Sequence, residues 1–224
     1  MSEVQRRRWH NWSGSVQAQP REIVRPASSE ELSRLVVGYS RDGRRVRVVG
    51  AGHSFTPLVQ TDDVLMSLDR LQGVEALDEE RGTATVLGGT TLHRLSEDLF
   101  QGGVSQENLG DIDVQSIAGA ISTGTHGTGM GFGTLSTQVE GLTLVTASGD
   151  LLECSNEQHP EIFKAAQVSL GTLGIIAKVR LRVVPARRLH YRVARERLDD
   201  ILLNLERHKQ ENAHFVFFWF PYSP

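Results

Sequence analysis

The residues best suited to chemistry lie in a glycine-rich turn that follows a β-branched segment. The sequence there reads Val48-Val49-Gly50-Ala51-Gly52-His53-Ser54. The valines favour an extended backbone, whereas glycine permits positive φ and leaves no Cβ between the backbone N–H groups and a ligand. Such a turn suits a phosphate group. It lacks the third glycine of the dinucleotide pattern G-x-G-x-x-G, and Pro57 interrupts the helix which that pattern requires. A nicotinamide dehydrogenase is therefore disfavoured, and His53 needs a role of its own.

A second segment, residues 115–129, is also rich in glycine and hydroxyl side chains. It reads Gln115-Ser116-Ile117-Ala118-Gly119-Ala120-Ile121-Ser122-Thr123-Gly124-Thr125-His126-Gly127-Thr128-Gly129. Its middle, 117–121, predicts a short helix that begins after Ser116, and we expect the N-terminus of this helix to offer N–H groups to an anion. Gly119 permits close approach of a backbone or a ring. A flexible linker is the alternative, but such linkers do not carry Ile117, Ile121 and His126 among the small residues.

Composition narrows the class of partner. The 224 residues carry a formal net charge of −3, and the one basic cluster, Arg6-Arg7-Arg8, is short and terminal, so no nucleic-acid partner is expected. The arginines precede Trp9-His10-Asn11-Trp12 instead of an apolar run, which argues against a secretory leader. No stretch of about 18 apolar residues predicts a membrane span. We therefore expect a cytoplasmic protein.

The single cysteine and the scattered histidines predict no metal site. Cys154 has no partner for a disulfide, and we expect it to be a small buried apolar side chain. His53, His93, His126 and Cys154 share no ligand spacing such as H-x-x-x-H or C-x-x-C. His93 falls within a predicted helix, where a surface or packing role is expected.

The remaining pattern predicts an alternation of helices and strands. Apolar spacing indicates a helix after Ser28 or Ser29, and another after Thr90 or Thr91 with Leu92, Leu95, Leu99 and Phe100 on its apolar face. A third helix is expected to begin at Pro160. The predicted strands are 45–49, 64–68, 74–77, 83–87, 139–145, 151–154 and 174–184.

A composition break at Pro185-Ala186 predicts two domains, 16–186 and 187–224. The second is expected to hold a strand at 189–193, an amphipathic helix with Leu198, Ile201, Leu202 and Leu205, and an aromatic strand, Phe215–Phe220. So few residues cannot bury their own apolar faces well, so we expect an incomplete domain. The aromatic strand would be an aggregation-prone edge unless it finds a partner strand.

Two motifs of this sequence, which occur in the order typical of a known family, also indicate a family resemblance. Val49–Phe55, followed by Gln115–Gly119 and Thr123–Gly127, resembles the FAD-binding (PCMH-type) domain of the vanillyl-alcohol oxidase superfamily, most closely its sugar-lactone and alditol oxidase branch. Leu170–Ile176 is a third match, and Phe218–Tyr222 resembles the opening of that branch's substrate domain. The resemblance implies an α+β fold in which two α+β subdomains hold FAD between them, followed by the beginning of an α+β substrate domain.

The resemblance also implies which residues contact FAD. The first loop would wrap the diphosphate: Arg47, Val48, Val49, Gly50, Ala51, Gly52, His53 and Ser54. The second motif would line the flavin and diphosphate: Ser116, Gly119, Thr123, Gly124, Thr125 and His126. Ile175 or Ile176 would present backbone groups to the adenine end. His53 would bond covalently to the methyl group of the flavin ring, since neutral imidazole is a nucleophile near pH 7; a noncovalent or structural histidine is the alternative. The ring of His126 would either hydrogen-bond the cofactor or hold the glycine turn.

Asp111 and Gly110 are the candidate catalytic residues. By resemblance, Asp111 stands where the branch often has serine over the flavin, and a carboxylate there would bind a substrate hydroxyl or change the flavin potential. Gly110 would leave room for dioxygen. The implied reaction is hydride transfer from a CH–OH carbon of a sugar lactone or polyol to FAD, with reoxidation by dioxygen or another acceptor. The alternative is an FAD-binding module without turnover, because the acid/base residues of the substrate domain are absent.

Overall fold

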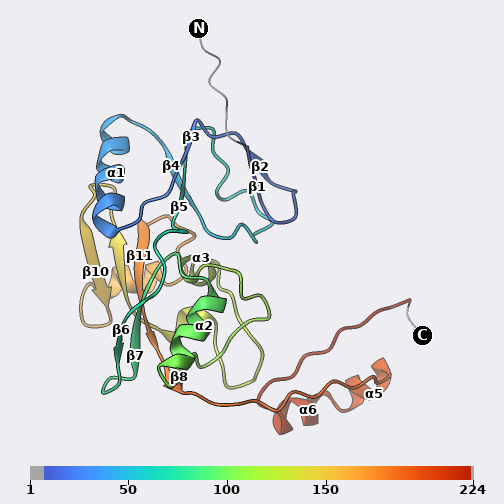
Figure 1. Ribbon diagram of the computed structural model, residues 1–224. Coiled ribbons are helices and arrows are strands. Elements are labelled where there is room, and N and C mark those ends of the chain that lie inside the picture. The colour runs from blue at the N-terminus through green and yellow to red at the C-terminus, as the bar shows by residue number, and fades with distance from the viewer. Residues whose placement is uncertain (1–7, 223–224) are drawn as a thin grey trace.

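The computed structural model describes residues 8–222 (Figure 1). Its helices are α1 (Ser29–Arg41), α2 (Leu92–Gln101), α3 (Ile117–Ser122), the 3-10 helix η1 (Leu135–Gln138), α4 (Pro160–Ala166), α5 (Leu198–Leu203) and α6 (Leu205–Glu211). Its strands are β1 (Trp9–His10), β2 (Gln17–Ala18), β3 (Glu22–Val24), β4 (Val46–Val49), β5 (Val64–Ser67), β6 (Val74–Asp78), β7 (Thr83–Leu87), β8 (Val104–Ser105), β9 (Val139–Val145), β10 (Leu151–Ser155), β11 (Ile175–Arg182) and β12 (Val184–Pro185). The fold is α+β, as expected.

The larger sheet is antiparallel, with strand order β10-β9-β11-β7-β6. Alternate residues of β7, β9 and β11 are apolar and buried, as required when one face of an antiparallel sheet covers the core. Side chains of α2, α3 and α4 complete that core, among them Leu95, Ile121 and Phe163. Part of the other face is polar, where Lys178 pairs with Glu75 at 2.7 Å and Arg182 with Glu140 at 3.0 Å.

The smaller sheet is parallel, with order β3-β5-β4. Its central strand β5 buries Val64, Leu65 and Met66 completely, which is the continuous apolar pattern of a strand covered on both faces. Helix α1 contributes Leu32 and Val36 to a second core, which also contains Val145 and Ala177 from the larger sheet. Figure 1 shows α1 beside the top of the larger sheet, where this shared core joins the two sheets.

Side-chain caps fix where the helices begin. Ser28 Oγ accepts a hydrogen bond from Glu31 N, and Thr91 Oγ1 accepts one from Arg94 N. These choose between the two capping residues predicted for each helix. The hairpins β6–β7 and β9–β10 also form where predicted. Phe100 was wrongly assigned to the apolar face of α2, because it is 59% exposed at the last turn.

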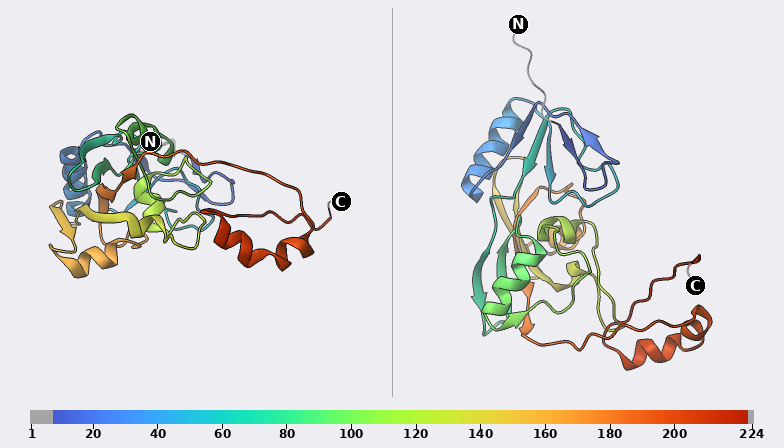
Figure 2. Two further views of the ribbon diagram at one scale, coloured as in Figure 1. Left: turned by 90° about the horizontal axis from the view of Figure 1, so that it is seen from below. Right: turned by 45° about the vertical axis from the view of Figure 1, so that its right-hand side comes forward.

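Residues 187–222 differ most from expectation. The predicted strands at 189–193 and 215–220 are wrong: both segments lack strand structure, and their apolar side chains are exposed except that of the half-buried Phe215. The predicted helix is divided into α5 and α6, neither of which buries a residue. Both views in Figure 2 show this segment extending away from the sheets. Ordered pairing in the first unit reaches Pro185, where β12 pairs with β8; the boundary at residue 186 stays a prediction.

The two adjacent residues at the end of α2 offer a test of the core. Leu99 is 1% exposed, so Leu99→Ala leaves a cavity, and we expect the free energy of unfolding to fall by about 2–5 kcal/mol. Phe100→Ala, the matched control, should change it by less than about 0.5 kcal/mol. Urea unfolding followed by circular dichroism measures both. Equal losses would contradict this placement of the core.

Candidate functional site

The glycine turn at 50–54 leaves β4 at the buried Val49 and is held from the N-terminal side. Gly52 has φ of +71°, which glycine adopts without strain. The backbone N–H of Trp12 donates to Gly52 O at 2.8 Å, and Asn11 Nδ2 donates to Ser54 O at 3.0 Å. The path of the turn is therefore fixed by protein contacts alone.

His53 stacks on Trp12. The ring centroids lie 5.4 Å apart with 19° between the planes. His53 is half-buried, whereas Trp12 is 68% exposed. The sequence analysis missed the contribution of Trp12 and Asn11, although two tryptophans beside polar residues, in Trp9-His10-Asn11-Trp12, were a usable signal.

Helix α3 is fastened to the turn before α2. Ile117 N donates to Thr90 O at 2.8 Å, and Ala118 N donates to Gly88 O at 3.1 Å. Ser116 Oγ accepts from Gly119 N at 3.4 Å. The first three N–H groups of α3 are thus already partnered. The prediction that the N-terminus of this helix offers its N–H groups to an anion is therefore wrong.

The two glycine-rich segments meet at Gly50 and Ser116. A Cβ built on Gly50 would overlap Ser116 Oγ, so the turn and the cap of α3 are in direct contact. Ser116 is 8% exposed. The contact brings together two of the predicted site segments, which are more than 60 residues apart in the sequence.

Two rows of backbone N–H groups near this contact have no partner among the described residues. One row comprises Ala51, Gly52, His53 and Ser54. The other comprises Gly110, Asp111, Ile112, Asp113 and Val114. Consecutive backbone N–H groups form an anion-binding concavity where a left-handed residue turns them to the same side, and Gly52, with φ of +71°, provides such a residue in the first row. The N–H groups of the second row are additional donors.

Residues 108–111 pack against 125–127. A Cβ on Gly127 would overlap Leu109 O, and one on Gly110 would lie 3.0 Å from His126 O. Asn108 Nδ2 donates to Thr128 O at 3.3 Å. Gly110 and the exposed Asp111 therefore lie beside the second motif, as predicted site residues should. The missing side chain of Gly110 is used for this packing.

The other residues of the second motif surround the end of α3. Thr123 Oγ1 donates to Gly119 O at 3.1 Å, and Gln115 Nε2 donates to Thr125 Oγ1 at 3.3 Å. Gly124 has φ of +69°. His126 Nδ1 donates to Gly127 O at 2.9 Å, which leaves Nε2 of a neutral ring as an acceptor. His126 thus holds the glycine turn, and its second nitrogen stays available to a ligand.

Ile175 and Ile176 reach this region only through Gly88. They lie on β11 and pair with Val145 and Leu144 of β9. A Cβ on Gly88 would overlap Ile176 O, and Gly88 O in turn accepts from α3. The pair is therefore connected to the site by backbone contacts, while the side chain of Ile176 is buried in the core.

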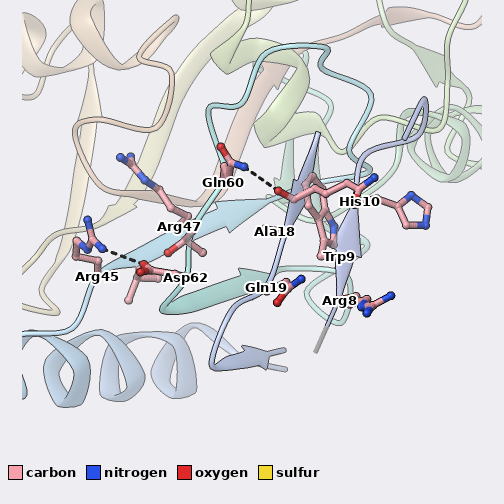
Figure 3. Close-up of a pocket in the computed structure, with 12 residues that line it drawn as sticks. Arg8, Trp9, His10, Ala18, Gln19, Arg45, Arg47, Gln60 and Asp62 are labelled. Atoms are coloured by element: carbon pink, nitrogen blue, oxygen red, sulfur yellow. Dashed lines mark hydrogen bonds and ion pairs between the residues drawn. The ribbon is translucent and has the colours of Figure 1, made fainter. Parts of the chain in front are cut away.

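Arg47 faces a different space. A cavity of about 1030 Å³ opens between the β1–β2 hairpin and β4, and among the predicted site residues only Arg47 lines it (Figure 3). Arg8, His10 and Arg45 also line it, and Arg45 pairs with Asp62 at 2.9 Å. Arg47 forms no ion pair with a described residue. Its guanidinium is thus an unneutralised cation three residues before Gly50.

Comparison with known families places both glycine-rich segments inside a matched domain. Residues 20–155 match the family described as FAD binding domain. The chain belongs to this FAD binding domain family. Residues 179–224 match a second family, described as D-arabinono-1,4-lactone oxidase. The resemblance found in the sequence is confirmed, and FAD is the ligand that the glycine-rich segments must be tested against.

Three curated relatives match nearly all of this chain and are themselves longer. L-gulono-1,4-lactone dehydrogenase of Mycobacterium tuberculosis is 43% identical over 215 residues, which are 96% of this chain and 50% of the relative. L-gulonolactone oxidase of Scyliorhinus torazame is 36% identical, over 96% of this chain and 49% of the relative. D-arabinono-1,4-lactone oxidase of Eremothecium gossypii is 38% identical, over 95% and 41%. The chain thus spans about half the length of the curated relatives it matches.

The described residues fit FAD. A diphosphate offers several acceptor oxygens, and the two rows of unpartnered N–H groups supply matching donors. A Cβ at position 50 or 127 would overlap a neighbouring oxygen atom, and one at position 110 would make a tight contact with His126 O, so the glycines keep these loops closely packed. Within the described residues no group of three or more His, Cys, Asp or Glu side chains gathers to hold a metal. None of the described helices combines the length and apolar character that a bilayer crossing needs.

The Gly50–Ser116 contact makes a testable prediction. In Gly50→Ala the new methyl group overlaps Ser116 Oγ, so the turn must shift, and we expect FAD affinity to fall at least about tenfold, or ~1.4 kcal/mol. Flavin fluorescence quenching measures the affinity. Gly131→Ala is the control, because nothing lies within 4 Å of a Cβ there. Adding Ser116→Gly should restore part of the loss; no restoration would show that the overlap is not the cause.

His93 anchors the loop that carries Asp111. Its Nδ1 pairs with Asp113 Oδ2 at 2.9 Å, its Nε2 lies 3.4 Å from Glu97 Oε1, and its backbone N donates to Asp113 O at 2.7 Å. The hydrogen bond with Asp113, followed by the charge of Glu97, raises the pKa of His93. The sequence analysis found no partner because Asp113 is distant in the chain.

This pairing predicts a pH-dependent stability. Because the pKa of His93 is raised in the folded state, its contribution is full below the unfolded pKa of about 6.5 and is lost as pH rises through the folded value. We expect the thermal midpoint of the wild type to fall more steeply above pH ~6.5 than that of His93→Gln. His190→Gln, at an exposed site without a described carboxylate partner, should follow the wild type. Parallel curves for wild type and His93→Gln would contradict the pairing.

Proposed function

We propose that this chain is the FAD-holding part of an oxidoreductase that oxidises the CH–OH group of a sugar lactone of the D-arabinono or L-gulono type, or of an alditol. Bound FAD would accept a hydride from the substrate carbon, and dioxygen or another acceptor would then remove the two electrons. The observation that carries the proposal is the pair of unpartnered N–H rows beside the Gly50–Ser116 contact, within a chain of the FAD binding domain family.

In this proposal the first loop binds the diphosphate. The N–H groups from Ala51 to Ser54 donate to its oxygens, and Gly50 lets the turn lie against Ser116. The guanidinium of Arg47 lines the separate cavity beside the β1–β2 hairpin, so in this proposal it acts on the diphosphate through its charge and not by direct contact with the turn. Val48 and Val49 belong to the strand from which the loop leaves. Ser116, Gly119, Thr123, Gly124, Thr125 and His126 line the flavin side. Backbone groups at Ile175 or Ile176 serve the adenine end.

His53 is proposed to bond covalently to the methyl group of the flavin ring. The bond would join an imidazole nitrogen to the methyl carbon. The methyl carbon and the imidazole ring would each lose one proton, and an external acceptor such as dioxygen would take up the two electrons and two protons, giving peroxide in the case of dioxygen. His53 supports this role because it stands on the cofactor turn, with neighbouring N–H groups that have no described partner, and forms no described ion pair. A noncovalent contact is the alternative.

Asp111 is proposed to face the substrate. Its carboxylate is exposed on the row of unpartnered N–H groups, where it would accept a hydrogen bond from a substrate hydroxyl or change the flavin potential. Gly110 is proposed to leave room for dioxygen, and its lack of a side chain also allows close packing against His126 O. The names of the relatives include both a dehydrogenase and an oxidase, so the acceptor stays open between dioxygen and another carrier.

A binding module without turnover is the second candidate. It is favoured by residues 187–222, where α5 and α6 bury no side chain. Lactones and alditols should be assayed with dioxygen, for peroxide, and with a dye as acceptor. Bound flavin without turnover under either condition supports the module, and turnover supports the enzyme.

Intact mass spectrometry under denaturing conditions tests the cofactor and its linkage. After loading with FAD, we expect the wild type to gain the mass of one FAD and His53→Ala to gain none. His190→Ala serves as the control, since it also removes a histidine but at an exposed position outside both glycine-rich segments, and it should keep the added mass. An unmodified wild type that still binds FAD in native buffer would exclude the covalent bond and leave noncovalent binding.

A further inference from the structure

The segment Trp9–Trp12 lies across the glycine turn and holds it at separate points. Beyond the two backbone-directed hydrogen bonds from Trp12 N and Asn11 Nδ2, a Cβ on Gly52 would lie 3.2 Å from the ring of Trp9. The indole of Trp12 covers the imidazole of His53. We propose that Trp12 is a positioning residue, whose indole fixes the orientation of the His53 ring for FAD. This proposal rests on the proposed FAD site.

The exposure of Trp12 argues against a purely packing role. Tryptophan side chains that stabilise a core are largely buried, whereas Trp12 is 68% exposed. Its only ring partner among the described residues is His53. The near-parallel geometry, with 19° between the planes, is the offset-stacked arrangement that aromatic rings prefer. Among the described residues, the indole therefore stacks on one side chain alone, the imidazole of His53.

Trp12 is itself held in place by Asn11. This side chain is 2% exposed and acts as a hub: its Oδ1 accepts from Val16 N at 3.0 Å, and its Nδ2 donates to Ser54 O and to the hydroxyls of Ser13 and Ser15. The backbone of the segment is thus fixed by buried hydrogen bonds in the absence of cofactor. The indole is preorganised, and the imidazole stacked on it loses rotational freedom before FAD arrives.

Loss of the stack on Trp12 would affect the reaction of His53. An unstacked His53 at the tip of a glycine turn would sample several ring orientations, and a reacting nitrogen must sit within bond-forming reach of one carbon. Stacking selects one plane and leaves the ring edge, which carries the nitrogens, available. The expected consequence is faster covalent attachment at unchanged FAD affinity.

The test uses three variants of the whole chain. Trp12→Leu removes the stack, Trp12→Phe keeps an aromatic ring, and Phe55→Leu is the control, because Phe55 is 67% exposed in the same region and has no described ring partner. In the FAD-free chain, the imidazole C–H resonances of His53 are assigned with His53→Ala. We expect a ring-current shift that Trp12→Leu abolishes, Trp12→Phe retains in part and Phe55→Leu leaves unchanged.

A time course of intact mass at saturating FAD then measures attachment. Trp12→Leu should slow it about three- to tenfold, the factor of one aromatic stack, with Trp12→Phe intermediate and FAD affinity within about twofold of wild type. His53 resonances unaltered in Trp12→Leu would overturn the proposal, as would equal slowing in Phe55→Leu. A wild type that binds FAD without any covalent mass would defeat the linkage proposed for His53, while the resonance shift would still decide the role of Trp12.

Discussion

Close backbone approach around α3 is the constraint on which the rest of the structure depends. A Cβ on Gly88 would overlap Ile176 O, one on Gly89 would overlap Leu68 O, and one on Gly50 would overlap Ser116 Oγ. These contacts bring both sheets to the same end of one short helix. Because no side chain fills the space, the loops that leave this point run close together, and their N–H groups are left without acceptors.

The same constraint decides where positive potential lies. The N-terminal N–H groups of α3 are satisfied by Thr90 O, Gly88 O and Ser116 Oγ, so the helix end contributes little to binding. The available donors belong to the loops on either side, which explains how a chain with net charge of −3 suits an anionic cofactor. Oriented backbone dipoles act at short range and are insensitive to the overall charge. Arg47, three residues before the turn, is the nearby cation without an ion-pair partner among the described residues.

The sequence predicted the local features of this arrangement, because each depends on few neighbouring residues. Ser28, Thr91 and Ser116 cap their helices as hydroxyl residues do, and the hairpins form around their turns. The two glycine motifs were also recognisable as a pair. The local pattern could not predict contacts between residues that are far apart in the sequence. These are the contacts of His93 with Asp113 and of His53 with Trp12, and those of the acceptors at the start of α3. Segment 189–193 alternates and segment 215–220 is an aromatic run, both patterns typical of strands, but neither has a described partner strand, and an extended segment becomes a strand only when another pairs with it.

The C-terminal residues reach the site through one loop. His214 Nδ1 donates to Thr128 O at 2.9 Å, the ring of His214 stacks on Phe132 at 5.1 Å, and a Cβ on Gly129 would overlap Ala213 O. Thr128 directly follows Gly127, whose own missing Cβ lets it pack on Leu109 beside Asp111.

These few contacts determine how the C-terminal residues lie against the loop at 128–132. Since α5 and α6 bury no side chain, the contacts with residues 128–132 place the second unit, and they act on the loop that carries His126. Any displacement of this unit would therefore move the backbone that carries the residues proposed to face the flavin. A substrate-binding element attached here would be positioned by the same loop that carries the proposed flavin-side residues. Such shared positioning is needed to hold a CH–OH carbon at a fixed distance from the flavin.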